Sequence, residues 1–210
     1  MDITEFKKNA YSLIDWISEY YENIDDLPVK SQVKPGDIYQ RFPNKAPETP
    51  ISFDHQLKEF NEHILPGITH WQHPMFYAYF PASTSFPSML GEMLTAALGA
   101  QCMIWDTSPA AAELEEKVCV WLRDAIGLPN TWEGVIQDTA STATLSSILT
   151  AREWKTDFQI NQHGSSGQTL RYYASSEVHS SIEKGIKIAG IGAKNLVKIE
   201  VDKQGAIPSR

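Results

Sequence analysis

From residue 134 onward the chain alternates short strand-like segments with helical ones, and this alternation restricts the possible folds more than any other feature. Strand patterns cover 134–137, 170–174 and 196–201, and helical patterns cover 143–155 and 180–189. Strands separated by helices form βαβ units, in which neighbouring strands run parallel. We therefore predict an α/β fold with a mainly parallel sheet.

The N-terminal part of the chain is organised differently. Apolar residues recur at helical spacing over 3–24, and Asp2 followed by Glu5 is typical of a helix start. Five prolines then make 28–52 an extended crossing segment, and 53–66 has the pattern of a shorter helix. The apolar face of the first helix is wide, so it must pack either on its own domain or on a partner subunit.

Two further helices are predicted before the alternating region. The first covers 87–98 and ends at Gly99. The second begins with Ser108 as its N-cap and Pro109 as its first residue. Gly127 is the candidate for the C-terminal cap of this second helix.

Composition and charge exclude several classes of protein. The chain has 210 residues and a net charge of −8, without the clustered cations of a nucleic-acid-binding protein. It has no apolar run long enough for a membrane span, and its first residues lack the pattern of a secretory signal. Cys102 and Cys119 are too few for a disulfide framework, which favours a reducing, cytoplasmic setting.

A run of small, mostly polar residues lies where a strand pattern ends and a helix pattern begins. It consists of Thr139, Ala140, Ser141 and Thr142. Free backbone N–H groups and hydroxyls at a helix N-terminus suit a phosphate group. Because the run has no glycine and is not a P-loop, an ordinary Ser/Thr helix cap is the alternative interpretation.

His179 lies at a similar junction, between the strand pattern at 170–174 and the next helix. Ligands of open α/β sheets bind beyond the carboxyl ends of the strands. His179 and Ser141 are therefore predicted to lie at the same edge of the sheet. A core position near a helix start is the alternative interpretation of this histidine.

The densest aromatic stretch covers 71–86, where Pro74 and Pro81 favour a loop. Aromatic side chains in a loop belong either to the core or to the wall of a ligand pocket. No Lys or Arg occurs between Lys58 and Lys117. A pocket built from this stretch would therefore offer no cation to an acidic substrate side chain.

Three histidines near this stretch raise the question of a zinc site: His63, His70 and His73. The sequence has no HExxH motif, no nearby thiolate pair and no evident fourth ligand. We therefore predict no metal site.

Four ordered segments together resemble one enzyme family. They are HWQHPMFYAYFPASTSFPSMLGEMLTAALG, WDTSPAAAELEEKVCVWL, GVIQDTASTATLSSILTAR and ASSEVHSSIEKG. The set is similar to the group II pyridoxal-phosphate-dependent amino-acid decarboxylases, and within them to the aromatic-L-amino-acid decarboxylases. The resemblance extends over essentially the whole chain. It implies the type I, aspartate aminotransferase-like fold of pyridoxal-phosphate enzymes and an obligate homodimer with active sites at the subunit interface.

The resemblance also implies roles for individual residues. Thr139, Ala140 and Ser141 match the positions that hold the cofactor phosphate. His179, the catalytic residue of the set, matches the histidine that stacks on the pyridine ring and helps to orient the substrate. The matches to the substrate pocket are Trp71, Tyr79, Phe80, Pro81, Ala82, Gln101 and Met103, the last two in the neighbouring subunit's pocket.

Some positions depart from the family pattern. Ala82 stands where relatives that use catechols often have a threonine, and Asp106 replaces a small apolar residue. Both departures leave the particular aromatic substrate open. The sequence DTAS replaces the glycine-rich phosphate loop of the glutamate-specific branch, which argues against that branch.

By this resemblance, 1–85 form a dimer-forming helical segment with the pocket loop, and 86–210 form the first part of the cofactor domain. The His-Lys pair, the aspartate that pairs with the pyridine nitrogen and the loop with the catalytic tyrosine do not occur in this sequence. We therefore expect the N-terminal portion of an enzyme, inactive by itself.

The predicted reaction is decarboxylation of an aromatic L-amino acid to its amine and CO₂. One alternative is an aromatic aldehyde synthase of the same fold, which also deaminates the product oxidatively. The other is a non-catalytic remnant that only dimerises.

Overall fold

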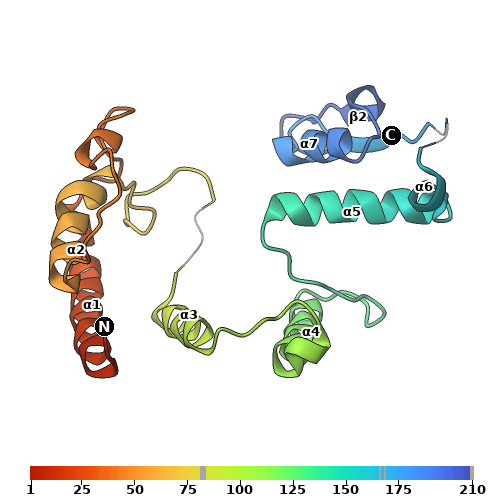
Figure 1. Ribbon diagram of the computed structural model, residues 1–210. Coiled ribbons are helices and arrows are strands. Elements are labelled where there is room, and N and C mark those ends of the chain that lie inside the picture. Colours follow the sequence, from red (N-terminus) through yellow and green to blue (C-terminus); the bar gives the residue numbers. More distant parts are fainter. Residues whose placement is uncertain (81–83, 166, 168, 209–210) are drawn as a thin grey trace. The chain divides into compact units, whose positions relative to one another are not determined.

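The computed structural model describes residues 1–80, 84–165, 167 and 169–208 (Figure 1). The chain divides into two compact units, Met1–Gly99 and Ala100–Arg210. In the described part of the chain, no helix is both long enough and apolar enough to cross a membrane. The predicted domains, 1–85 and 86–210, refer to a complete enzyme and stay a prediction.

The first unit is helical. Its α-helices are α1 (Ile3–Glu22), α2 (Phe53–Glu59) and α3 (Phe86–Leu98). The Asp2 side chain accepts hydrogen bonds from the N–H groups of Thr4 and Glu5, both at 2.8 Å, and so starts α1 as predicted. α2 continues through a π-helical turn, Phe60–Ile64, into a 3₁₀ turn, Leu65–Gly67, so the predicted helix over 53–66 changes its winding part-way.

Aromatic contacts join α1 to the segment after α2. The indole N–H of Trp16 donates to Asn61 Oδ1 at 2.9 Å, and the Trp16 ring meets Phe60 edge-on at 5.4 Å. Short 3₁₀ turns lie at Ile24–Asp26, directly after α1, and at Tyr39–Arg41 in the crossing segment. These contacts make the first helices of the chain one packed group.

The second unit contains the βαβ arrangement. Its elements are α4 (Pro109–Ala125), α5 (Ala140–Lys155), α6 (Gln159–His163), β1 (Tyr172–Ser175), α7 (Ser180–Ile188) and β2 (Leu196–Ile199), with 3₁₀ turns at Trp105–Thr107 and Ala193–Asn195. β1 and β2 are parallel, with Tyr172 opposite Leu196. The α/β class and the parallel pairing are as predicted.

One predicted strand does not form. Within the described residues, 134–137 has no partner strand, and the sheet consists of β1 and β2 alone. A strand exists only where a neighbouring strand accepts its backbone hydrogen bonds. The sequence pattern of 134–137 is that of a strand, but this part of the chain supplies no neighbour for it.

Helices α5 and α7 lie side by side in Figure 1 and enclose the core of the second unit. Ile148, Ile186 and Ala189 are its buried members. Gly185 permits the close approach, because a Cβ atom at this position would lie 2.7 Å from Ile148 Cδ1.

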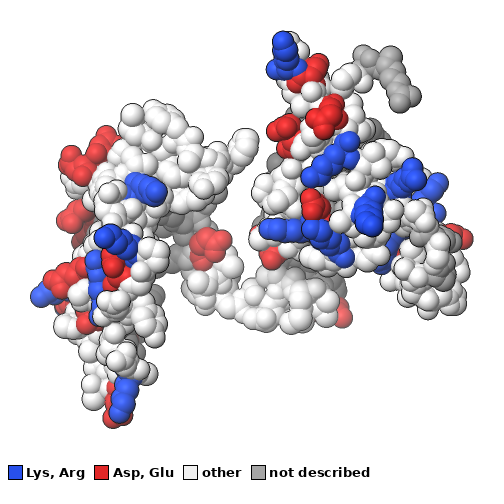
Figure 2. Space-filling model, turned by 90° about the horizontal axis from the view of Figure 1, so that it is seen from above, with Lys and Arg blue, Asp and Glu red and all other residues white. Residues whose placement is uncertain are grey.

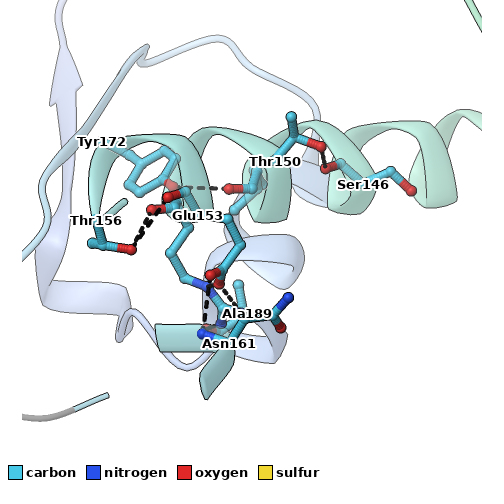
Figure 3. Close-up of polar contacts among 9 residues, drawn as sticks. Ser146, Thr150, Glu153, Thr156, Asn161, Tyr172 and Ala189 are labelled. Carbon is cyan, nitrogen blue, oxygen red and sulfur yellow. Dashed lines mark hydrogen bonds and ion pairs between the residues drawn. The ribbon is translucent and has the colours of Figure 1, made fainter. Parts of the chain in front are cut away.

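Polar contacts fix the C-terminal end of this helix pair (Figure 3). Arg152 donates to the Ala189 carbonyl at 2.7 Å and pairs with Glu153 at 2.8 Å. The buried Glu153 carboxylate also accepts from the Asn161 N–H at 3.0 Å, and Tyr172 donates its hydroxyl to the Ile148 carbonyl at 2.9 Å. Every charged group of the cluster thus has a partner, as a buried ion pair requires.

Candidate functional site

The first turn of α5 presents unused hydrogen-bond donors. Thr139 is the N-cap, and its hydroxyl accepts from the Thr142 N–H at 3.1 Å. Among the described residues, the N–H groups of Ala140 and Ser141 have no hydrogen-bond partner. These donors, the neighbouring hydroxyls and the positive end of a 16-residue helix together fit a phosphate group.

Asp138 adds a negative charge beside these donors. Its carboxylate accepts from the Thr139 N–H at 2.9 Å. A carboxylate this close to a phosphate repels it, even though helix N-termini favour anions in general. The site therefore combines attraction and repulsion for an anionic group.

His179 is the N-cap of α7, and its ring orientation is fixed locally. The Ser181 N–H donates to His179 Nδ1 at 3.2 Å, and the Ser181 hydroxyl lies 3.0 Å from the same atom. Because Nδ1 accepts a hydrogen bond, the proton of the neutral imidazole is on Nε2. The exposed His179 therefore has Nε2–H available as a donor.

The direction of α5 and α7 brings these two features to one end of the helix pair. Gly185 packs on Ile148, and four residues further along each helix the Ala189 carbonyl bonds Arg152. The helices therefore run in the same direction, and both N-termini lie at the same end. Ser141 in the first turn of α5 and His179 at the N-cap of α7 therefore lie toward this common end, whereas the predicted sheet edge at 134–137 does not form among the described residues.

A buried hydroxyl near this end has no partner. Ser176 follows the last residue of β1, and its N–H donates to the Ile199 carbonyl at 2.8 Å. Its Oγ is the single buried side-chain oxygen or nitrogen among the described residues without a hydrogen bond. An orphaned hydroxyl is typical of a site that another group completes. Sequence analysis missed Ser176, because no pattern in the chain marks an unpaired hydroxyl.

The aromatic loop of the first unit presents ring faces. Trp71 lies 4.7 Å from Phe76 and stacks on Tyr79, with ring centroids 5.7 Å apart and planes at 20°. Tyr79 has φ +58°, a left-handed conformation that is unusual for a bulky residue. Phe80 is completely exposed, and the predicted Pro81 and Ala82 lie outside the described residues.

The backbone of this loop is held by buried histidines. His70 and His73 are 3% and 8% exposed, and the Tyr20 hydroxyl lies 2.8 Å from His70 Nδ1. Burial lowers the pKa of His70, and nearby His73 lowers it further. Burial, with Tyr21 close by, raises the pKa of Tyr20. The sequence had pointed to these histidines only as zinc candidates, and the described residues contain no group of His, Cys, Asp or Glu placed to hold a metal ion.

Gln101 and Met103 lie at the start of the second unit. The Thr107 hydroxyl donates to the Gln101 carbonyl at 2.6 Å, which closes a tight turn before α4. Met103 is 73% exposed. Lys and Arg side chains gather on the second unit around α7 and β2 (Figure 2), whereas the sequence has none between Lys58 and Lys117.

Comparison with known families decides the classification. A model described as the pyridoxal-dependent decarboxylase conserved domain matches residues 35–209. The chain belongs to the pyridoxal-dependent decarboxylase family. Pyridoxal phosphate is the cofactor of this family, and the free donors of α5 fit its phosphate group.

Individual decarboxylase relatives agree with this classification. Tyrosine decarboxylase 2 of Narcissus pseudonarcissus is 39% identical over 209 residues, which cover 96% of this chain and 41% of the relative. Phenylacetaldehyde synthase of Petunia hybrida is 39% identical over 210 residues, which cover 97% of this chain and 41% of the relative.

A solved decarboxylase structure has the same fold. Catharanthus roseus tryptophan decarboxylase in complex with L-tryptophan superposes with a TM-score of 0.88 at 37% identity, covering 97% of this chain and 43% of that one. The predicted type I fold of pyridoxal-phosphate enzymes is therefore confirmed. The chain spans about two fifths of the length of these relatives.

Proposed function

We propose that the complete enzyme containing this chain converts an aromatic L-amino acid to its amine and CO₂ with pyridoxal phosphate as cofactor. The observation that carries the proposal is the parallel packing of α5 and α7, which places free N–H donors and the His179 imidazole at one end of the pair. The named activities of the relatives, tyrosine and tryptophan decarboxylation among them, support the reaction.

We assign the cofactor phosphate to the first turn of α5. The N–H groups of Ala140 and Ser141 and the hydroxyl of Ser141 would donate to it, and Thr139 would hold the turn in shape through its bond to Thr142. Each hydrogen bond to a phosphate is charge-assisted and therefore stronger than a neutral one.

His179 is assigned to the pyridine ring and the substrate carboxylate. The bound cofactor supplies an electron sink for the electron pair that the departing carboxylate leaves. The imidazole of His179 would stack on the ring, and Nε2–H would donate to the substrate carboxylate and hold it in the productive orientation. Ser181 contributes by fixing the Nδ1 side of the imidazole.

The aromatic loop is assigned to the substrate side chain. Trp71, Tyr79 and Phe80 offer ring faces and edges, and contacts between aromatic rings contribute about 0.5–1.5 kcal/mol per pair beyond burial. Pro81 and Ala82 would belong to the same wall. The lack of any cation between Lys58 and Lys117 supports an aromatic rather than an acidic substrate.

We further propose a cytoplasmic homodimer in which Gln101 and Met103 contribute to the neighbouring subunit's pocket. An apolar groove of about 550 Å³ supports dimerisation, and its lining includes Phe6, Ala10, Leu13, Phe86, Leu90 and Met93 from α1 and α3. Apolar side chains exposed along two helices favour packing against another protein surface. By itself this chain would be inactive, since it lacks the family's His-Lys pair.

An aromatic aldehyde synthase is the second candidate. The Petunia hybrida relative is named for this activity and is as similar to the chain as the Narcissus pseudonarcissus decarboxylase. The two enzymes differ in their products: an amine in one case, and in the other an aldehyde with ammonium, a two-electron oxidation that consumes O₂ and water and releases H₂O₂.

The test is an assay of the complete enzyme with tyrosine, tryptophan, phenylalanine and glutamate in the presence of pyridoxal phosphate. We expect CO₂ and an amine from at least one aromatic amino acid and no turnover of glutamate. Formation of an aldehyde and ammonium in equal amounts would instead identify the enzyme as an aromatic aldehyde synthase. Preferred turnover of glutamate, or no CO₂ from any aromatic amino acid, would overturn the proposal.

A further inference from the structure

A hydrogen bond between residues 50 positions apart ties the aromatic loop to α1. The Tyr20 hydroxyl and His70 Nδ1 are 2.8 Å apart, and the His70 ring is almost completely buried. On its backbone side, the His70 N–H donates to the Val29 carbonyl at 3.0 Å. His70 is therefore held from two directions by parts of the chain that precede the loop.

From His70 the loop continues through a series of bonded turns. The His73 N–H donates to the His70 carbonyl at 3.0 Å, and the Phe76 N–H donates to the His73 carbonyl at 2.9 Å. The Met75 N–H donates to His73 Nδ1 at 2.9 Å. Trp71 lies within the first of these turns. Its ring packs on the ring of Phe76, the residue that ends the second turn. The position of the Trp71 indole thus depends on where His70 is held.

The Tyr20 ring, which carries the hydroxyl, is held by neighbouring aromatic rings. Its ring stacks on Trp16 with centroids 5.6 Å apart and planes at 12°, and Tyr21 meets it edge-on at 5.3 Å. Trp16 is fixed in turn by its bond to Asn61. The hydroxyl therefore projects from a rigid aromatic group on a 20-residue helix.

We infer that Tyr20 and His70 are positioning residues that hold Trp71 in the wall of the substrate pocket. The inference rests on the proposed function and extends it to two residues of the first unit to which the family resemblance assigned no role. Apolar side chains would fill this buried space without the cost of burying a hydroxyl and an imidazole. A buried polar pair instead specifies one geometry, because each group is satisfied only when it is hydrogen-bonded to the other.

The first test uses the complete enzyme and the variant Tyr20→Phe, which keeps the ring and removes the hydroxyl. Loss of one neutral hydrogen bond is expected to raise KM for the aromatic substrate about three- to tenfold. kcat and the dissociation constant of pyridoxal phosphate are expected to stay within about twofold, because the cofactor site is untouched. Tyr21→Phe is the matched control, since no hydrogen bond of the Tyr21 hydroxyl occurs among the described residues, and its KM should equal that of the wild type.

His70→Asn and His70→Leu test the other partner. Asparagine places a polar atom close to the position of Nδ1, so it should keep KM nearer to the wild-type value than leucine does. Equal KM values for Tyr20→Phe and Tyr21→Phe, or identical values for the two His70 variants, would overturn the inference.

A second measurement does not depend on activity. Hydrogen exchange of the His73 and Phe76 amides should accelerate in Tyr20→Phe and stay unchanged in Tyr21→Phe. If the wild-type enzyme has no decarboxylase activity, the proposed function fails while this readout still tests the loop. Exchange that is unchanged in Tyr20→Phe contradicts the inference even if decarboxylation is found, and so does faster exchange with an unchanged KM.

Discussion

The N-terminal end of the α5–α7 pair and the aromatic loop differ in which groups they leave unsatisfied. At the helix ends, the N–H groups of Ala140 and Ser141 and the hydroxyl of Ser176 have no partner in the described part of the chain. In the loop, the Nδ1 atoms of His70 and His73 are hydrogen-bonded, and the rings of Tyr79 and Phe80 are exposed instead.

This difference shows how each region can bind. Unused donors at a helix N-terminus are available to an anion, and exposed rings on a fixed backbone are available to another ring. Our proposal assigns the cofactor phosphate to the helix ends and an aromatic side chain to the loop. Each of the following changes weakens or strengthens one of these two regions.

The largest effect is expected from His179→Ala. Misplacement of reacting groups by about 1 Å costs on the order of a hundredfold in rate. We therefore expect kcat of the complete enzyme to fall about a hundredfold or more at saturating pyridoxal phosphate, with only a modest fall in Tm from loss of the N-cap bond to Ser181. His163→Ala, an exposed histidine in α6, is the control. A lower Tm with nearly normal kcat would show that His179 is only a structural residue.

Gly185→Ala is expected to crowd the contact between α5 and α7. The added Cβ would lie 2.7 Å from Ile148 Cδ1, the far end of a side chain that can turn aside, so we expect the lower end of the about 1–3 kcal/mol that overpacking costs. Chemical denaturation should show that loss in the free energy of unfolding. Gly91→Ala in α3 is the control, because a Cβ atom there would meet nothing within 4 Å, and it should not destabilise the protein. Gly190→Ala would not serve as a control, because Gly190 has φ +72°, a conformation that strains any residue with a Cβ atom.

Ser141→Ala removes one donor from the proposed phosphate site. One hydrogen bond to a charged group contributes about 1.5–3 kcal/mol, so pyridoxal phosphate should dissociate at least tenfold more readily. kcat at saturating cofactor should change little. Ser147→Ala lies on the same helix, where its hydroxyl only bonds the Ala143 carbonyl, and should retain the cofactor normally.

Asp138→Asn should strengthen the binding of pyridoxal phosphate, whereas Ser141→Ala weakens it. Removing the carboxylate beside the phosphate donors relieves repulsion, and the affinity for pyridoxal phosphate should rise about two- to fivefold at low salt. The gain should shrink as ionic strength increases. An affinity that is unchanged at every salt concentration would place the phosphate away from Asp138.

The smallest effect is expected from pH. The folded protein lowers the pKa of His70 below its ordinary value of 6.5, so the unfolded chain binds more protons between the two values. The free energy of unfolding should therefore fall as pH drops through 6.5 toward the lower pKa, and be unaffected by His70 above 6.5. Tm measured across this range should depend less on pH in His70→Asn than in the wild type.

Local sequence was sufficient for the features that depend on neighbouring residues. Asp2 and Thr139 cap their helices, Pro109 begins α4, and Gly127 follows its end with φ +74°. The sequence also indicated the helix starts that contain Ser141 and His179, and the roles of these two residues stay predictions. One local detail differed, since Ser108 occupies the N-cap of α4 without a side-chain hydrogen bond there.

The features that sequence could not supply depend on distant partners. The segment 134–137 has a strand pattern but no strand beside it within the described chain. The bond between Tyr20 and His70 joins residues 50 positions apart, and neither residue has a sequence neighbour that signals it. Ser176 is notable only for a bond that it lacks, which no residue pattern encodes.

The separation between the buried frame of the loop and its exposed rings has a consequence for how such enzymes diversify. Because His70 and His73 carry the structural bonds, mutations at Tyr79 and Phe80 would change the exposed rings that we propose for substrate contact with little cost to folding. Substrate range can then drift by single substitutions while the scaffold is inherited unchanged. The relatives named tyrosine decarboxylase, phenylacetaldehyde synthase and tryptophan decarboxylase are 39%, 39% and 38% identical to the chain, so the named activity changes at an almost constant sequence distance.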